Sequence, residues 1–214
     1  LQYINNQLLP EFEVIFVDAK STDDSLLKIK NFSFREGITA KILECKERIS
    51  IYEAWNLAIG NSTHDYVMNY NTDDKLFRSA LQTVFTYSLL YPEVDIIYSN
   101  VLITNDLDHD QFSGYYIWSD ANVKENLLRG CCVGPFPLLK KKSVIDAGWF
   151  NPKFHISGDY EMWCRMRSKG YKFSKIDEPI GVYYLNPQGT STQQTNERYA
   201  EHVRQDTAIR QRYA

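Results

Sequence analysis

The sequence has 214 residues, of which 24 are basic and 27 acidic, and its net charge is −3. This balance, without a long block of one sign, argues against a protein that binds nucleic acid through a broad basic face. Hydrophobic residues make up 43% of the chain, enough for one sizeable core, and no apolar run approaches the ~20 residues of a membrane span, so we expect a globular domain without a transmembrane segment.

The first hundred residues alternate between short apolar runs and helix-like segments. The runs predict strands near 13–17, 41–45, 65–70 and 94–98, and the segments predict helices near 1–9, 26–29, 51–59 and 76–90. This alternation predicts an α/β fold with a mostly parallel sheet and helices on both faces. Ligands bind beyond the carboxyl ends of the strands in such sheets, so polar residues at those ends are the first candidates for a site.

The rhythm changes after residue 100. Residues 104–120 are polar and aromatic without a clear period, which indicates a long loop or a hairpin. Helices are predicted near 121–129, 142–147 and 159–168, and short strands near 171–176 and 180–185. The last twenty residues predict a polar helix with a solvated face.

Two adjacent carboxylates, Asp73 and Asp74, follow the third apolar run. Paired carboxylates repel each other unless a cation lies nearby. Mg²⁺ uses one or two protein carboxylates together with substrate phosphates, so the sequence suggests a divalent-metal site here. Capping of the following helix by Asp74 explains the same residues equally well.

Two further acidic residues stand at the ends of predicted elements. Asp18 follows the first strand and can accept hydrogen bonds from a base or a ribose, although a turn is the simpler role. Asp159 begins a helix, whose dipole favours a carboxylate, and can act as a general base; taken alone, a first-turn Asp explains it better. Gly158 beside it would allow a substrate to approach closely.

Five segments, in order, resemble the motifs of family 2 glycosyltransferases. They are V-D-A-K-S-T-D at 17–23, I-Y-E-A-W-N at 51–56, M-N-Y-N-T-D-D at 68–74, A-G-W-F-N-P-K-F with G-D-Y-E-M-W-C-R between 147 and 165, and Y-Y-L-N-P-Q-G-T-S at 183–191. Each segment is weak alone, but their order and spacing hold from about residue 1 to residue 192. The resemblance implies a GT-A fold, the α/β fold of nucleotide-diphospho-sugar transferases.

The resemblance also implies a reaction. A sugar would move with inversion from a nucleoside diphosphate donor, a UDP-sugar first of all, to a glycan, lipid-linked or protein acceptor, as in polysaccharide biosynthesis. By this resemblance Asp159 would be the base, Mn²⁺ or Mg²⁺ would bind at Asp73 and Asp74, and the nucleotide would lie near Asp18, Arg48, Asn56, Asn71 and Thr72. Residues 104–136 and Trp149 would line the acceptor pocket.

Departures from the family pattern keep two other functions open. Asn71 replaces the first Asp of D-x-D, Gly158 replaces a common Glu, and Asn186 stands where many relatives carry a metal-contacting His. A non-catalytic module that binds carbohydrate or nucleotide-sugar, and a nucleotidyltransferase, therefore remain alternatives. The family's first strand would precede Leu1, so we expect a chain trimmed at its N-terminus.

The expected organisation is one catalytic domain over residues 1–194, followed by a polar helix over 195–214. Residues 1–100 would form the nucleotide-sugar half and residues 101–194 the acceptor and base half. The four cysteines, Cys45, Cys131, Cys132 and Cys164, include no C-x-x-C pair. This pattern predicts free thiols and argues against a zinc site. Free thiols favour a cytoplasmic location, and peripheral membrane contact stays open.

Overall fold

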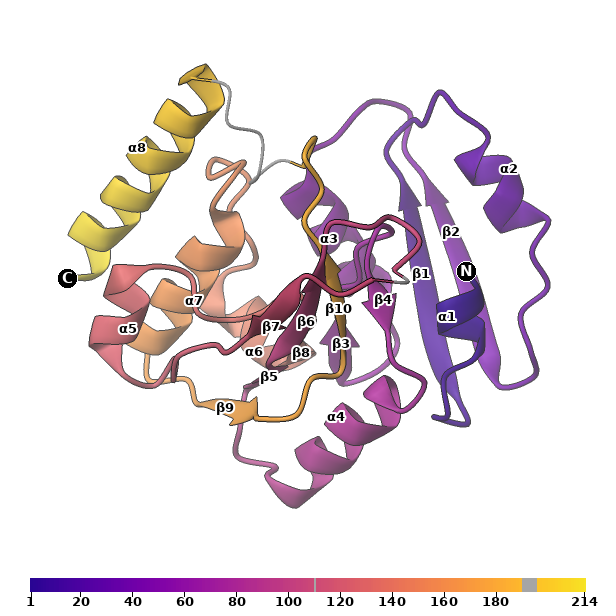
Figure 1. Ribbon diagram of the computed structural model, residues 1–214, viewed down its shortest axis with the longest axis horizontal. Helices are drawn as coiled ribbons and strands as arrows, with labels where there is room; N and C mark the ends of the chain where they lie inside the picture. The colour runs from indigo at the N-terminus through magenta and orange to yellow at the C-terminus, as the bar shows by residue number, and fades with distance from the viewer. Residues whose placement is uncertain (110, 190–195) are drawn as a thin grey trace.

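The computed structural model describes residues 1–109, 111–189 and 196–214 (Figure 1). In chain order its elements are α1 (Gln2–Asn5), β1 (Phe12–Asp18), α2 (Ser25–Lys30), β2 (Ile38–Glu44), α3 (Ile51–Asn61), β3 (Tyr66–Met68), β4 (Lys75–Leu76), α4 (Ala80–Leu90), β5 (Ile96–Ser99), β6 (Val101–Thr104), β7 (Gly114–Tyr116), α5 (Lys124–Arg129), β8 (Leu138–Lys140), α6 (Lys141–Ala147), α7 (Gly158–Ser168), β9 (Phe173–Ile176), β10 (Gly181–Tyr184) and α8 (Asn196–Tyr213). Within the described residues, none of these helices combines the length and apolar character that a membrane span requires.

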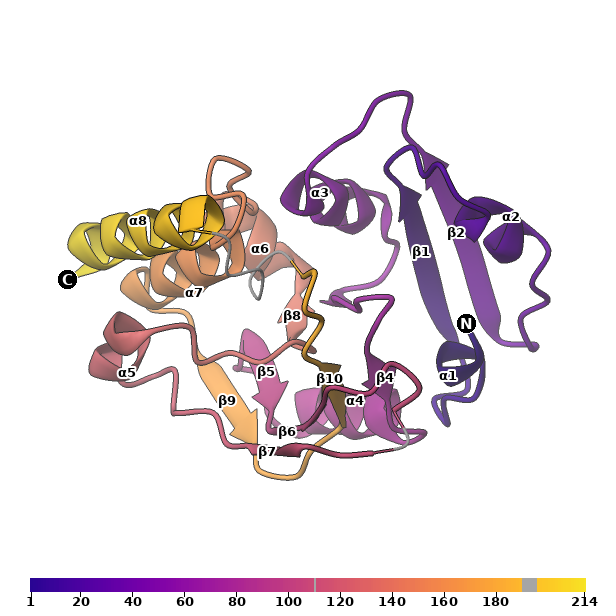
Figure 2. The same cartoon turned by 45° about the horizontal axis from the view of Figure 1, so that its top comes forward.

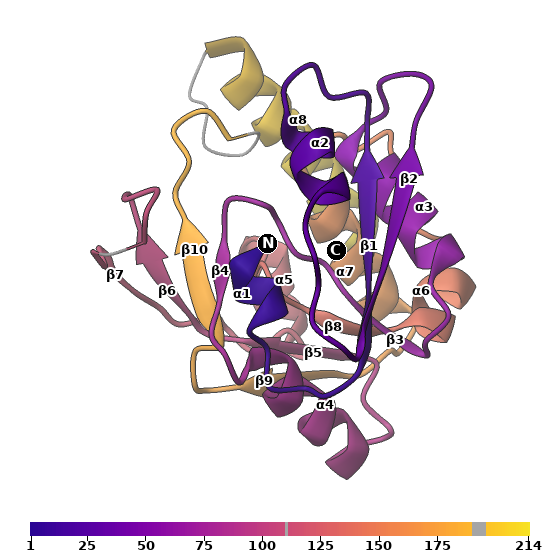
Figure 3. The same cartoon turned by 90° about the vertical axis from the view of Figure 1, so that its right-hand side faces the viewer.

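The strands form three small sheets. β1 and β2 pair in parallel, with Asp18 opposite Glu44, so their carboxyl ends coincide. A second sheet has the order β3-β8-β5-β9 and a third the order β4-β10-β6-β7. In Figure 3, β1 and β2 run side by side in front of the second sheet, whose strands run across them.

The direction of β8 differs from the predicted, mostly parallel sheet. β8 lies between β3 and β5 and is antiparallel to both. Strands β5 and β9 are parallel, as the alternation predicts. β8 follows residues 134–137, beyond the region of regular alternation, and it pairs with the backbone N–H and C=O groups that β3 and β5 would otherwise leave open. The predicted α/β class holds, and the pairing is mixed.

The hydrophobic core lies on both sides of β5. Ile96 and Tyr98 belong to one buried cluster, with α3, α6 and α7, whereas Ile97 belongs to a second cluster with α4. Successive side chains of a strand point to opposite faces, so one buried strand supplies both clusters. Figure 2 shows α3 between β1 and the helices α6 and α7, which places it at the junction of the two halves of the chain.

Two predicted helices are shorter than their sequence patterns. The guanidinium group of Arg35 donates hydrogen bonds to the carbonyl oxygens of Asn5, Gln7, Leu9 and Pro10, so these carbonyls serve a turn and α1 ends at Asn5. α4 begins at Ala80, not near 76, because the preceding residues form β4 against β10.

The C-terminal helix α8 is not a solvated tail. Ile209 is fully buried in the same cluster as α7, and Gln205 is buried beside it. The opposite face carries exposed groups such as Arg204. Figure 1 shows α8 in yellow along α7. The expectation of a solvated helix therefore holds for one face alone. The predicted domain boundary between 194 and 195 lies outside the described residues.

The start of α3 is fixed by a reciprocal cap. The Ser50 hydroxyl accepts a hydrogen bond from the Glu53 N–H, and the Glu53 carboxylate accepts one from the Ser50 N–H at 2.7 Å. This capping box provides acceptors for two N–H groups, one of them a helix N–H without an intrahelical partner. The predicted cap at Ser50 is confirmed.

We expect Ser50→Ala to lower the free energy of unfolding by about 1 kcal/mol, because the Glu53 N–H loses its acceptor. Ser79 precedes α4 without a side-chain cap, so Ser79→Ala is the matched control and should change stability little. Urea unfolding of the two variants measures the difference. Equal stabilities would contradict the role of the capping box.

Candidate active site

The loop after β3 is held by a buried carboxylate, Asp74. One oxygen of Asp74 accepts a hydrogen bond from the Tyr184 N–H at 2.9 Å, and the other accepts one from Asn71 Nδ2 at 3.0 Å. Asp74 is 2% exposed, and burial raises its pKa to about 7. With both oxygens engaged inside the protein, Asp74 fixes the loop to β10. Asp74 is not the predicted helix cap, because Ser79 precedes α4, whereas its role as a metal ligand stays a prediction.

Asp73 is the partly exposed carboxylate of the same loop. Its Oδ2 accepts a hydrogen bond at 3.1 Å from Nδ2 of Asn186, a residue just beyond the end of β10. Its carbonyl oxygen lies 3.0 Å from Nε2 of His109, in the loop between β6 and β7. A carbonyl oxygen only accepts, so this contact assigns the ring proton to Nε2 of His109. Three segments distant in sequence thus meet at Asp73.

The donor set around Asp73 is sparse for a metal ion. Among the described residues, no group of three or more His, Cys, Asp and Glu side chains is arranged to hold a cation. The predicted ligand Asp74 is buried, and the amide nitrogen of Asn71 points to it. Mg²⁺ binds through one or two carboxylates when substrate phosphates supply further oxygens. The residues present therefore fit a cation that the substrate helps to hold.

The other predicted nucleotide-site residues lie at strand ends. Asp18, at the end of β1, accepts the Ser21 N–H with its carboxylate at 3.2 Å. Arg48 is exposed in the loop after β2, whose carboxyl end coincides with that of β1. Thr72 is exposed beside Asp73. These positions leave Arg48 and Thr72 accessible to a ligand, whereas Asp18 also closes a turn.

Asn56 has a structural role in addition to the predicted place near the nucleotide, which stays a prediction. Its Nδ2 donates to the Phe150 carbonyl at 2.8 Å, and its Oδ1 accepts the Phe150 N–H at 3.0 Å. The amide thus ties α3 to the turn after α6. The ring of Trp149 lies near Gly60 of α3, 3.8 Å from the position of a Cβ there, and its place in an acceptor pocket stays a prediction.

Asp159, the predicted base, lies in the first turn of α7 and contacts α3. Its Oδ1 accepts hydrogen bonds from the Tyr52 hydroxyl at 3.0 Å and from the Tyr160 N–H at 2.8 Å. Burial raises the pKa of Asp159, and the negative charge of Asp206 adds to the effect. Burial also raises the pKa of Tyr52, which therefore stays protonated and donates. The result is an oriented carboxylate that is easier to protonate than a solvated one.

Gly158 leaves room for the ring of Tyr52. A Cβ atom at Gly158 would lie 2.6 Å from the Tyr52 ring, well inside van der Waals contact. The ring is fixed, because the Tyr52 hydroxyl also donates to the Ile156 carbonyl at 2.9 Å. The close approach predicted for a substrate at this glycine is thus made by the protein itself.

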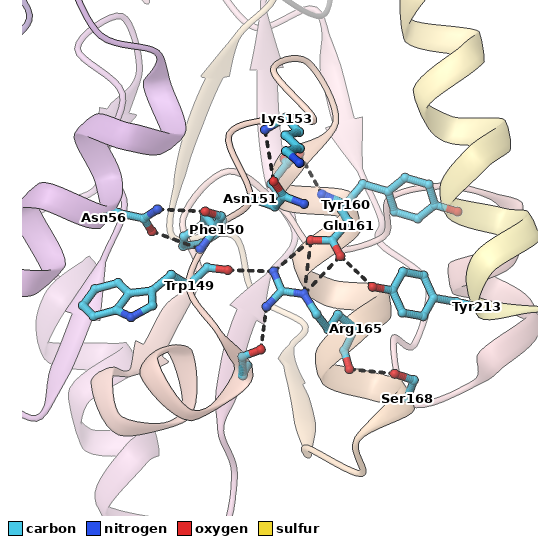
Figure 4. Close-up of polar contacts among 12 residues, drawn as sticks. Asn56, Trp149, Phe150, Asn151, Lys153, Tyr160, Glu161, Arg165, Ser168 and Tyr213 are labelled. Atoms are coloured by element: carbon cyan, nitrogen blue, oxygen red, sulfur yellow. Dashed lines mark hydrogen bonds and ion pairs between the residues drawn. The ribbon is translucent and has the colours of Figure 1, made fainter.

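A buried ion pair organises the rest of α7 (Figure 4). Arg165 contacts the carboxylate of Glu161 at 2.8 Å and donates to the carbonyl oxygens of Ala147 and Trp149 at 2.6 and 2.7 Å. The Tyr213 hydroxyl of α8 donates to Glu161 at 2.6 Å. Burying charge is costly unless every charged group is satisfied, and here each one is. The network fixes the turn after α6 to α7.

Sequence reasoning gave no role to Tyr52 or His109. Tyr52 lies within the I-Y-E-A-W-N segment, but its partner Asp159 is 107 residues away, so the segment alone does not show the contact. His109 lies in a polar loop without periodicity, and its contact with Asp73 depends on the β6–β7 hairpin. The hairpin itself is among the structures predicted for residues 104–120 and is confirmed.

Comparison with solved structures identifies the fold. The chain superimposes on the mannosyltransferase PcManGT of Pyrobaculum calidifontis, solved with GDP-Man and Mn²⁺, with a TM-score of 0.73 at 18% identity, covering 100% of this chain and 59% of that one. It superimposes on S. aureus TarS 1–349, solved with UDP, with a TM-score of 0.72 at 15% identity, covering 97% and 59% of the two chains. The fold is the glycosyltransferase GT-A fold, as predicted.

Sequence comparison then gives the family. The family model described as glycosyl transferase family 2 matches residues 1–148, so the chain belongs to that family. The amylovoran biosynthesis glycosyltransferase AmsB of Erwinia amylovora is 23% identical over 202 residues, which are 86% of this chain and 64% of AmsB. The chain thus spans less than two thirds of the length of these relatives. In the fifth predicted motif, residues 190–191 lie outside the described residues.

We expect Gly158→Ala to destabilise the protein by about 1–3 kcal/mol, because the added methyl group must displace the Tyr52 ring. Gly130 is the matched control: it is extended, with φ 166°, and has no heavy atom within 4 Å of the position of a Cβ. Thermal unfolding compares the two alanine variants. A Gly158→Ala protein as stable as Gly130→Ala would show that the ring moves freely.

Proposed function

We propose that this domain transfers a sugar from a nucleoside diphosphate donor to an acceptor hydroxyl with inversion, and that the donor is a UDP-sugar. The observation that carries the proposal is the Asp159 carboxylate, oriented by Tyr52 at the start of α7 in a family 2 glycosyltransferase chain. The solved structures with the same fold were determined with UDP or UDP-GlcNAc and with GDP-Man, which supports a nucleotide-sugar donor.

Asp159 acts as the general base in this proposal. Its Oδ1 is engaged by Tyr52 and Tyr160, while its Oδ2 makes no hydrogen bond to another described residue. Oδ2 takes the proton of the acceptor hydroxyl as that oxygen forms its bond to the anomeric carbon and the sugar–phosphate bond breaks. The diphosphate leaves with the bonding electron pair. The raised pKa of Asp159 suits this role, because a general base is most effective when its pKa is near the pH of the reaction.

Asp73 is the residue that would hold Mn²⁺ or Mg²⁺. The bound cation would supply Lewis-acid neutralisation of the leaving diphosphate. Asn186 and His109 hold the Asp73 side chain and backbone in place from the two sides of the loop. Asp74 positions the loop from beneath, and Asn71 is bonded to Asp74, so neither is proposed as a metal ligand.

The nucleotide is proposed to bind across the carboxyl ends of β1 and β2. Asp18 offers its carboxylate to the base, and Arg48 offers a cation, from adjacent strand ends. Thr72 is exposed next to Asp73, in the loop after β3, and is proposed to contact the diphosphate. Open α/β sheets bind ligands at this edge, which supports the placement.

The acceptor is proposed to be a glycan chain of a polysaccharide under synthesis, lipid-linked or protein-linked. The support is the relative AmsB, whose name assigns it to amylovoran biosynthesis. All four cysteines are free thiols, which supports a reducing, cytoplasmic setting for the reaction.

A non-catalytic nucleotide-sugar-binding module is the second candidate. The observation that favours it is the sparse metal set, in which Asp73 is the one partly exposed carboxylate of the loop and no three-ligand group occurs in the described residues. Binding of UDP with Mn²⁺, but no release of UDP or GDP from UDP-glucose, UDP-galactose, UDP-GlcNAc or GDP-mannose, would favour this candidate over the transferase.

We expect Asp73→Ala to reduce Mn²⁺-dependent nucleotide release from a UDP-sugar by about 100-fold or more, because leaving-group neutralisation is worth several kcal/mol. The thermal shift that UDP and Mn²⁺ produce together should also disappear. Asp177→Ala is the control, since the Asp177 side chain is 81% exposed and pairs with Lys175. Unchanged Mn²⁺ dependence in Asp73→Ala would remove Asp73 from the metal site.

We expect Asp159→Asn to lower kcat by about 100-fold or more while UDP binding stays intact. The Asn Oδ1 still accepts from Tyr52 and Tyr160, so the fold is preserved. In the wild type, kcat should fall as the pH drops through the raised pKa of Asp159, above the ordinary 3.8.

Stability provides the control for this variant. The folded-state pKa of Asp159 is raised, so the ionised carboxylate costs stability at every pH above its unfolded pKa. Asp159→Asn should therefore unfold at neutral pH with a free energy no lower than that of the wild type. An Asp159→Asn protein that keeps wild-type kcat, or that loses UDP binding alone, would refute the base role.

A further inference from the structure

The C-terminal helix α8 contacts the segment that leads into Asp159. Gln205 of α8 is 6% exposed, and its Oε1 accepts hydrogen bonds from the backbone N–H groups of Ile156 and Ser157, both at 3.1 Å. These groups lie at the start of α7, where the helix provides no acceptor of its own. A buried N–H without a partner destabilises the fold, so the Gln205 oxygen stabilises the conformation of the backbone at Ile156 and Ser157.

The orientation of the Gln205 amide is fixed by its neighbours. Its Nε2 donates to the Glu201 carboxylate at 2.8 Å and lies 3.1 Å from Nδ1 of His155. Since the amide nitrogen only donates, Nδ1 of His155 is the acceptor and carries no proton. The amide oxygen therefore points to the backbone of Ile156 and Ser157.

Asp206, the next residue of α8, contacts the same segment. Its Oδ1 accepts the Ser157 hydroxyl at 2.7 Å. Arg210 and His202 of the same helix lie 3.4 and 3.6 Å from the Asp206 carboxylate. α8 thus contacts both the backbone and the side chain of Ser157, which occupies the N-cap position of α7 but makes no capping hydrogen bond with its side chain.

The opposite side of this segment is held by α3. The Tyr52 hydroxyl donates to the Ile156 carbonyl at 2.9 Å and to Asp159 Oδ1 at 3.0 Å. The N–H of Ile156 therefore donates to Gln205, and its carbonyl oxygen accepts from Tyr52. With the backbone fixed at 156 and 157, the first turn of α7 and the Asp159 carboxylate on it have one position relative to α3.

We infer that Gln205 is a positioning residue for Asp159, so that the C-terminal helix contributes to the transferase site by fixing the backbone that leads into Asp159. The inference rests on the proposed base role of Asp159. The family model matches residues 1–148, so α8 lies beyond the matched segment. The buried side chain of Ile209 also holds α8 against the core. We therefore expect the helix to stay packed when the hydrogen bonds of Gln205 are removed.

Three variants of the full chain test this inference. Gln205→Leu removes the acceptor oxygen while keeping similar volume, and Gln205→Glu keeps an acceptor oxygen and adds a negative charge. Gln211→Leu is the matched control, because it makes the same substitution at an exposed position of the same helix. Amide hydrogen exchange at residues 156 and 157, and nucleotide release from the UDP- and GDP-sugars named above with Mn²⁺, are measured for each.

In Gln205→Leu we expect exchange at both amides to quicken by about tenfold and kcat to fall by about tenfold, with the donor KM unchanged. Gln205→Glu should recover most of kcat above its acid limb. That limb should move to higher pH, because a like charge near Asp159 disfavours its ionised form. Gln211→Leu should match the wild type in amide exchange, kcat and donor KM. A merely structural residue would change stability without this split between kcat and KM or this shift in pH dependence.

The results that overturn the inference are separate from those that overturn the proposed function. Wild-type kcat in Gln205→Leu, with Asp159→Asn inactive, overturns the positioning role alone. Wild-type turnover in Asp159→Asn overturns the base role and the proposed function with it. The ¹³C signal of the Asp159 carboxyl carbon, followed across pH, needs no donor: the same titration in the wild type and in Gln205→Leu also overturns the inference.

Discussion

The hydroxyl group of Tyr52 is the link on which the arrangement of the site depends. It lies between two acceptors, the Ile156 carbonyl at 2.9 Å and Asp159 Oδ1 at 3.0 Å, and so joins α3 to α7. Gly158 leaves the space for the ring. Because α3 also packs beside β1, which ends at Asp18, the position of the candidate base is coupled to the strand that begins the nucleotide edge.

Beyond this link, α7 is fixed by charge. The Glu161–Arg165 pair is buried, and such a pair stabilises a fold only if its remaining hydrogen-bonding capacity is used. Here Arg165 also bonds the backbone at Ala147 and Trp149, and Tyr213 of α8 bonds Glu161. The ion pair therefore acts less as an isolated attraction than as a connector of α6, α7 and α8. Asp159, the candidate base, lies in the first turn of α7. Arg165, further along the same helix, fixes the orientation of α7 relative to α6.

What the sequence predicts well is local. The β1 and β2 strands, the Ser50 cap and the helix that begins beside Asp159 follow from apolar runs and capping residues within a few positions. The roles of polar side chains did not follow, since their partners are remote: Asn56 bonds a residue 94 positions away and Asp74 one 110 positions away. The buried face of α8 was not predicted, because apolar residues occur on both its buried and its exposed face, such as Ile209 and Val203, and so give little periodicity.

Asp73 and Asp74 are adjacent carboxylates with different environments. Their repulsion would imply a cation if both remained ionised and exposed. Instead, burial, with a smaller contribution from the charge of Asp73, raises the pKa of Asp74 to about 7, while Asp73 stays partly exposed. The raised pKa means that Asp74 takes up a proton more readily than a solvated carboxylate, which relieves part of the repulsion. One carboxylate is a weak site for a divalent cation alone, but a diphosphate brings further oxygens and charge, and metal and donor would then bind together rather than in sequence.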